Sequence, residues 1–157
     1  MIMDERTEFA DAVSVAAAAG TALIGDVIDM QVVRDLGNGR EVFLVITTDT
    51  EIITGGTAGT LGFQLASDAA AAIATDGTAT VHWASKLFVT DDAGANAAEF
   101  NVGGVIACIA LPLEGPPYER YLGILAVTAT TTTTAGKINA FLTLDPHAAY
   151  KTYADAI

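Results

Sequence analysis

The strongest constraint on the fold is the alternation of apolar and polar residues with a period of two, which recurs in short segments. In the segment 60–66, TLGFQLA, the apolar residues Leu61, Phe63 and Leu65 alternate with smaller or polar ones. Successive side chains of a β-strand point to opposite faces, so this pattern predicts half-buried strands rather than helices. Similar segments are 27–33 (VIDMQVV), 41–48 (EVFLVITT), 78–84 (TATVHWA), 100–111 (FNVGGVIACIAL) and 137–145 (KINAFLTLD).

Glycine and short polar residues mark the ends of these segments. The stretch 34–41, RDLGNGRE, contains Gly37, Asn38 and Gly39, which tolerate the positive φ angles of tight turns, and it predicts a hairpin or a corner. The pair Gly103 and Gly104 predicts a bulge or a close approach of two backbones.

Only one short segment has the features of a helix. This is 67–77, SDAAAAIATDG, where Ser67 or Asp68 could cap one or two helical turns before Gly77.

Five consecutive threonines, residues 130–134, stand between two strand-like segments. Threonine is β-branched and favours extended backbone, and the run ends in Ala135 and Gly136, which indicate a turn. We therefore predict a hairpin with a threonine-rich tip, while a flexible linker remains the alternative.

About seven or eight short strands with a single small helix describe an all-β sandwich or barrel. Residues 1–25 are acidic and then alanine-rich without a clear period, and we predict an N-terminal arm that becomes ordered against a neighbour. Residues 26–145 form the predicted β-domain, and residues 146–157 form a C-terminal tail.

The composition of the chain indicates which classes of molecule it can bind. The chain has 157 residues, which suits one domain, and its net charge of −12 repels nucleic acid and anionic lipid. Because 52% of the residues are hydrophobic and only 17% are charged, we expect part of the surface to be covered by other chains. The acidic start does not suit a secretion signal, and the longest apolar run, 102–113, is too short for a membrane helix, so an intracellular protein is expected.

Few residues indicate a catalytic or metal-binding site. The single cysteine, Cys108, lies in an apolar segment and is interpreted as a packed residue. His82 lies on the strand face opposite Val81 and Trp83 and is interpreted as a solvated strand residue, with Trp83 on the core face, while His147 has no nearby nucleophile in the sequence. Asp91 and Asp92, with Asn96, could offer oxygen ligands to calcium, although their spacing is not that of an EF-hand. We expect no enzymatic activity, no cofactor and no metal.

Arg120 is the most informative charged residue. It lies between Tyr118 and Tyr121 in the segment YERYL, a combination typical of interface anchors, and it could equally pair with a carboxylate inside the protein.

Several segments, in order, resemble the capsid cement (decoration) proteins of tailed phages, of the type found in a Bordetella short-tailed phage. The resemblance spans nearly the whole chain. It rests on 4–15 (DERTEFADAVSV), 27–48 (VIDMQVVRDLGNGREVFLVITT), 59–68 (GTLGFQLASD), 111–127 (LPLEGPPYERYLGILAV) and 135–145 (AGKINAFLTLD).

This resemblance implies a jelly-roll-like antiparallel β-sandwich on the outside of an icosahedral shell of HK97-type major capsid protein. Such a protein bridges neighbouring capsid subunits and stabilises the head against the pressure of packaged DNA, after synthesis in the cytoplasm of the host bacterium. The chain departs from the family pattern at Gly123, Ile124 and Leu125, where relatives often carry a basic residue. The residues that match the family's corner and late strand are Arg34, Asp35, Gly37, Pro112, Arg120, Tyr121 and Leu122.

The predicted partners are the phage major capsid protein and further copies of the chain, as a homodimer or a homotrimer. A carbohydrate-binding or adhesion module is the alternative function, since β-sandwiches often carry sugar sites, and an enzyme comes third. The residues predicted to contact the capsid or another copy are Phe9, Asp11, Val13, Val15, Arg34, Asp35, Arg120 and Tyr121.

Overall fold

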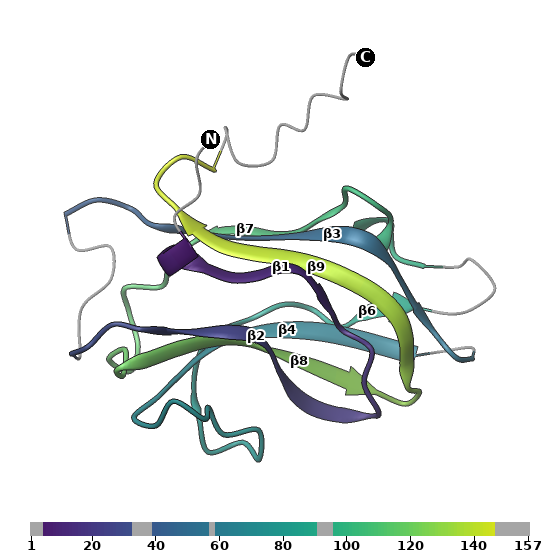
Figure 1. The fold of residues 1–157 in the computed structure, drawn as a ribbon, viewed down its shortest axis with the longest axis horizontal. Coiled ribbons are helices and arrows are strands. Elements are labelled where there is room, and N and C mark those ends of the chain that lie inside the picture. Colours follow the sequence, from purple (N-terminus) through teal and green to yellow (C-terminus); the bar gives the residue numbers. More distant parts are fainter. Residues whose placement is uncertain (1–4, 33–38, 57–58, 91–95, 147–157) are drawn as a thin grey trace.

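The chain folds into two antiparallel β-sheets that pack face to face (Figure 1). The structure is a computed structural model, and it describes residues 5–32, 39–56, 59–90 and 96–146. The predicted all-β sandwich is thus confirmed. The strands are β1 Glu8–Ser14, β2 Gly20–Asp29, β3 Phe43–Thr54, β4 Gly59–Asp68, β5 Thr80–Ala84, β6 Phe88–Thr90, β7 Val105–Ala110, β8 Tyr121–Ala129 and β9 Thr133–Thr143, with short 3-10 turns η1 Glu5–Thr7 and η2 Ala98–Phe100.

The order of the strands is that of a jelly roll. One sheet has the order β1-β9-β3-β7, and the other has the order β2-β8-β4-β5, with β6 also paired to β4. The first strand pairs with the last, and the chain crosses repeatedly from one sheet to the other, as in two interleaved Greek keys.

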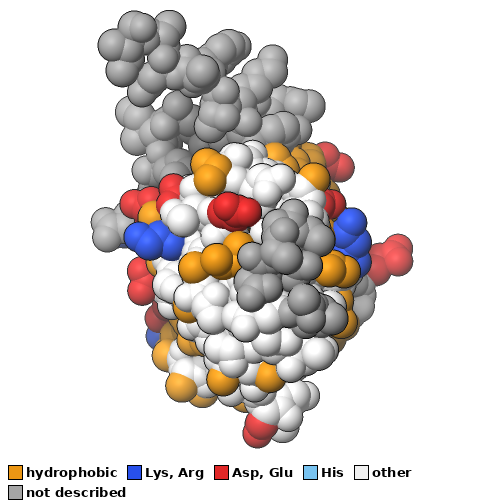
Figure 2. Space-filling model, turned by 90° about the vertical axis from the view of Figure 1, so that its right-hand side faces the viewer, with side chains coloured by type: hydrophobic (Ala, Val, Ile, Leu, Met, Phe, Trp, Pro, Cys, Tyr) orange, Lys and Arg blue, Asp and Glu red, His pale blue; other side chains and the backbone are white. Residues whose placement is uncertain are grey.

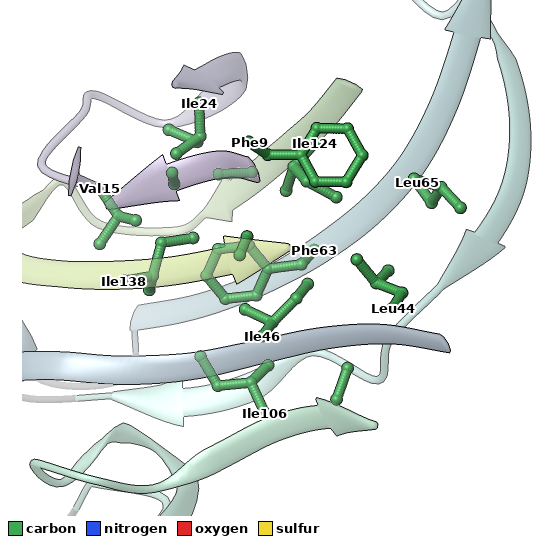
Figure 3. Close-up of a cluster of buried hydrophobic side chains, with 14 of the residues drawn as sticks. Phe9, Val15, Ile24, Leu44, Ile46, Phe63, Leu65, Ile106, Ile124 and Ile138 are labelled. Carbon is green, nitrogen blue, oxygen red and sulfur yellow. The ribbon is translucent and has the colours of Figure 1, made fainter. Parts of the chain in front are cut away.

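The core lies between the sheets and follows the predicted alternation. Leu61, Phe63 and Leu65 on β4 are fully buried, and Leu44 and Ile46 on β3 face them from the other sheet (Figure 3). Burying an aliphatic or aromatic side chain of this size contributes about 1.5–3 kcal/mol relative to leaving it exposed. The alternation therefore identifies the face of each strand whose burial stabilises the fold.

The N-terminal segment is a strand of the sandwich and not a separate arm. β1 pairs with β9, and the side chains of Phe9 and Val15 are 1% and 0% exposed in the shared core. Gly25 of β2 lies so close to the carbonyl of Phe9 that any side chain at position 25 would overlap it. The predicted boundary at residue 25 is therefore wrong, because β2 continues across it.

The threonine run connects the two sheets and is neither a hairpin tip nor a flexible linker. β8 belongs to one sheet and β9 to the other, so the strands before and after the run do not pair with each other. Thr130 has a positive φ of 73°, which redirects the chain, and Thr133 already belongs to β9. The hairpin interpretation assumed that strands neighbouring in sequence would also be neighbours in a sheet.

The predicted helix does not form. Residues 69–79 instead fold over the outer face of the β2-β8-β4-β5 sheet, where Ile73 packs with Ala66 and Leu125. Gly123 makes room for this contact, because a Cβ there would lie 2.6 Å from the Cδ1 of Ile73. Gly123, one of the positions where this chain departs from the family pattern, therefore leaves room for an apolar loop to pack on the sheet.

The glycine pair before β7 was predicted correctly as a close approach. A Cβ on Gly104 would overlap the backbone carbonyl of Glu99, so only glycine fits. The corner predicted around Gly37 lies outside the described residues, but β2 and β3 on either side of it belong to different sheets.

Candidate interaction surface

The predicted contact residues near the N-terminus do not form an exposed surface. Phe9 and Val15 are buried, and Val13 packs partly buried against the same core, which leaves Asp11 as the exposed member of the group. Side chains that fill the core cannot also lie on a capsid shell. The prediction that Phe9 and Val15 contact a partner is therefore corrected, while that for Asp11 and Val13 stays a prediction.

Arg120 and Tyr121 are close together at the start of β8, whereas Arg34 and Asp35 lie outside the described residues. The guanidinium of Arg120 donates two hydrogen bonds to the carboxylate of Asp29, each 2.8 Å long, and its carbon lies 4.9 Å from the centre of the Tyr121 ring. The internal partner that the sequence left open is thus Asp29, at the end of β2.

This ion pair changes the electrostatics of the surface. The hydrogen bonds from Arg120, together with one from the backbone N–H of Gln31, lower the pKa of Asp29 to about 2. The same pair raises the pKa of Arg120. Because two of the guanidinium's N–H donors already bond to Asp29, Arg120 has fewer hydrogen-bond donors left for a partner than its sequence context suggested.

A hollow lies beside this pair, between the start of β1 and the end of β2. Its volume is about 410 Å³, and its walls include the carboxylates of Glu8, Asp26 and Asp29 with the guanidinium of Arg6.

His82 and Ser67 form a structural network behind the edge of β5. The hydroxyl of Ser67 lies 2.7 Å from Nε2 of His82, and it accepts a hydrogen bond from the backbone N–H of Glu119. The His82 ring stacks on Tyr118 at 3.9 Å, and burial lowers the pKa of His82. Ser67 is fully buried, so this arrangement joins β4, β5 and the segment before β8 rather than presenting a nucleophile.

His82 was predicted to be a solvated strand residue, and its half-buried position shows that this was wrong. Trp83 was assigned to the core face, and it does pack partly buried against the core.

The candidate calcium segment is only partly described. Asp91 and Asp92 lie outside the described residues, and Asn96 uses its side chain to accept from Thr90 and to donate to Glu51. Among the side chains that the structure describes, three or more histidine, cysteine, aspartate or glutamate residues do not gather as a metal-binding group.

One end of the sandwich is formed by three uncharged connections, which we call the threonine-rich end: residues 15–20, 55–56 and 130–134. They are held together by the backbone. Ala17 and Thr133 exchange N–H to carbonyl bonds of 3.0 and 2.9 Å, and the N–H of Gly55 donates to the carbonyl of Thr132. Figure 2 shows this end from outside, and uncharged side chains and backbone cover most of its described part.

The sequence did not reveal this surface. Alanine, glycine and threonine dominate the three segments, and residues 15–20 and 130–134 were interpreted separately, as part of an arm and as a hairpin tip. The available signal was that all three lack charge in a chain of net charge −12. Only the crossing of the chain between the sheets brings them to one end.

Within the described ranges, no helix has the length and apolar character needed to cross a membrane.

Comparison with known proteins gives one informative result. No curated protein matches the chain. The family model named Bbp16, a name that points to a Bordetella phage protein, matches residues 9–142, which include every strand except the first residue of β1 and the last residue of β9. The chain therefore belongs to the Bbp16 family.

Proposed function

We propose that this protein is a capsid cement protein, which binds the outside of an HK97-type major capsid lattice and links neighbouring subunits. The observation that carries the proposal is the family match over residues 9–142. The jelly-roll sandwich supports it, because a rigid body with short connections can transmit force between two attachment points. The protein acts by binding alone.

Many copies on a repeating lattice give strong total attachment from weak single contacts. Each copy resists the separation of the subunits that it joins, so the shell tolerates a higher internal pressure from packaged DNA. The acidic surface is suited to the exterior, where repulsion of nucleic acid has no cost.

The threonine-rich end is the part of the surface that we assign to the shell. Binding there buries hydroxyl, methyl and backbone groups and avoids the desolvation of carboxylates, which is costly unless each one is paired. Short side chains also lose little conformational entropy when they become ordered.

The proposal is tested by binding to purified expanded capsids from which this protein is absent. We expect the wild-type chain to sediment with the capsids and to raise their resistance to heat. Thr132→Asp, an exposed position at the threonine-rich end, should reduce retention, while Thr78→Asp, an exposed threonine in the segment 69–79, should not.

Two outcomes would count against the proposal in different ways. If the wild-type chain does not bind any such capsid, the cement function is wrong. If both aspartate variants bind as well as the wild type, the function stands and the assignment of the threonine-rich end is wrong.

A further inference from the structure

The sheet β1-β9-β3-β7 ends in a strand that lacks the usual protection of an edge. Among the described residues, β7 pairs only with β3, and its sequence VIACIA has neither charge nor proline. The edge strands β1 and β2 carry acidic residues, and β6 has only 3 residues. β5, with 5 residues, is also uncharged but is shorter than β7, which has 6. An uncharged edge with free backbone groups is a template for another strand.

The backbone of β7 offers hydrogen bonds at defined positions. The N–H of Leu111 donates to the carbonyl of Val42 at 2.8 Å, and the register of β3 and β7 continues this pairing. Hydrogen-bonded pairs alternate along an antiparallel ladder, so Ala107 and Ile109 bond towards β3. The N–H and carbonyl groups of Cys108 and Ala110 therefore point to the free edge.

Exposed apolar side chains stand at both ends of this edge. Val102, before β7, is 71% exposed, and Leu113, after it, is 66% exposed, the two highest values among the large hydrophobic residues that the structure describes. Between them, residues 102–113 contain no charged residue. This stretch is the free edge together with its flanks, and we call it the β7 edge.

We propose that a second copy of this chain binds along the β7 edge as an antiparallel strand, related by a twofold axis that passes between Cys108 and the Cys108 of the second copy. Opposite residues in a continuous sheet share a face, and Ala107 and Ile109 both pack towards the core. A twofold axis perpendicular to the sheet must then place one residue directly opposite its own copy, because only residues an even number of positions apart share a face. Pairing Cys108 with its copy puts the axis near the middle of β7 and joins the free backbone groups of the two Cys108 residues.

The same axis explains the exposed residues at the ends. In the antiparallel arrangement, Val102 of one copy comes near Leu113 of the second copy, so both exposed side chains gain an apolar neighbour at each end of the interface. Two chains of net charge −12 also approach most easily where no carboxylate has to be desolvated, which is the case for residues 102–113. The inference concerns self-association in solution and does not depend on capsid binding.

Cross-linking of the wild-type chain tests the position of the axis. Cys108 is the only cysteine, so any thiol cross-link must join two copies at that residue. A short bismaleimide should convert the folded protein into a covalent dimer and should leave the urea-denatured chain, at the same concentration, largely monomeric. Absence of a cross-linked dimer from protein that sediments as a dimer would overturn the proposed axis.

Sedimentation equilibrium tests the edge itself. The double variant Val105→Lys/Ala110→Lys changes two exposed positions of β7 and places like charges next to each other across the axis, so the dimer should be lost. The control Val81→Lys/Val89→Lys changes exposed valines of β5 and β6, and it should remain dimeric. A wild-type chain that is monomeric up to its solubility limit, or a β7 variant that stays dimeric, contradicts the proposal. If the variant fails to fold, as judged by circular dichroism, the cross-linking result decides.

Discussion

At the scale of single residues, close packing and local charge decide what each position tolerates. Gly25 and Gly20, both in β2, have positive φ angles of 68° and 139°. Their surroundings differ, because the space around Gly20 is open, whereas a side chain at Gly25 would overlap the backbone of Phe9. This pair separates the cost of backbone strain from the cost of a clash.

We expect Gly25→Ala to destabilise the protein more than Gly20→Ala. Both substitutions carry a conformational cost of about 1–2 kcal/mol, and Gly25→Ala adds an overpacking cost of about 1–3 kcal/mol. The free energies of unfolding are measured by urea denaturation. Equal losses for the two variants would show that β1 and β2 do not lie as close together as described.

A second prediction concerns the ion pair of Arg120 and Asp29. The pKa of Asp29 in the folded state, about 2, lies below the ordinary value of 3.8, so the pair stabilises the fold above that ordinary value. The stabilisation is lost as the pH falls through about 2. In an NMR titration, Arg120→Gln should raise the pKa of Asp29.

The control for this titration is Asp76. Hydrogen bonds from Thr78 lower its pKa, and Arg120 is not among the groups that shift it. Its titration should therefore be unchanged in Arg120→Gln. A parallel change at both carboxylates would indicate a general structural effect and not the loss of the pair.

At the scale of elements, the main correction concerns β1. An arm that orders only on a partner would contribute nothing to the stability of the free chain, whereas a strand paired within the sandwich contributes through its buried face. Phe9 and Asp11 lie on the same strand with opposite environments, one buried and one exposed. They therefore provide a matched pair for testing the role of the element.

Phe9→Ala should lower the free energy of unfolding by about 3–5 kcal/mol, because a large cavity forms in the shared core. Asp11→Ala should change it by less than about 0.5 kcal/mol, since an exposed substitution removes little. Urea denaturation of both variants provides the comparison. If Phe9→Ala unfolds at the wild-type urea concentration, β1 is not part of the stable fold.

At the scale of the whole molecule, charge opposes compaction. Nineteen acidic residues against seven basic ones leave strong repulsion over the surface of one small sandwich. Raising the salt concentration from about 10 to about 150 mM shortens the screening length from about 30 to about 8 Å. The folded state should gain more from this screening than the expanded unfolded chain.

The Tm should therefore rise with salt over this range, by about 3 °C for each kcal/mol of repulsion that is relieved. Differential scanning calorimetry measures this change. The variant Glu41→Gln/Glu114→Gln, which neutralises two exposed positions, should have a higher Tm at low salt and a smaller response to salt. A Tm that falls or stays constant would mean that repulsion does not limit the stability of this fold.

The period-two pattern was sufficient to predict the fold class and much of the core, because the faces of a strand are set by neighbouring residues. It correctly marked Leu61, Phe63 and Leu65 as core residues. The pair Gly103 and Gly104, rather than the alternation, correctly predicted the close approach before β7. The alternation failed at Phe9 and at the threonine run, where the partner strand is distant in sequence.

The sequence alone determined that the chain forms strands, which residues alternate between faces, and that the whole carries a strong negative charge. Only the tertiary structure decided which strands are neighbours, that β1 closes the sheet against β9, and that β7 is left as an uncharged edge. The physical reason is that alternation is a local property, whereas pairing in a jelly roll depends on contacts between residues far apart in the chain. The threonine-rich end and the β7 edge are both products of that pairing.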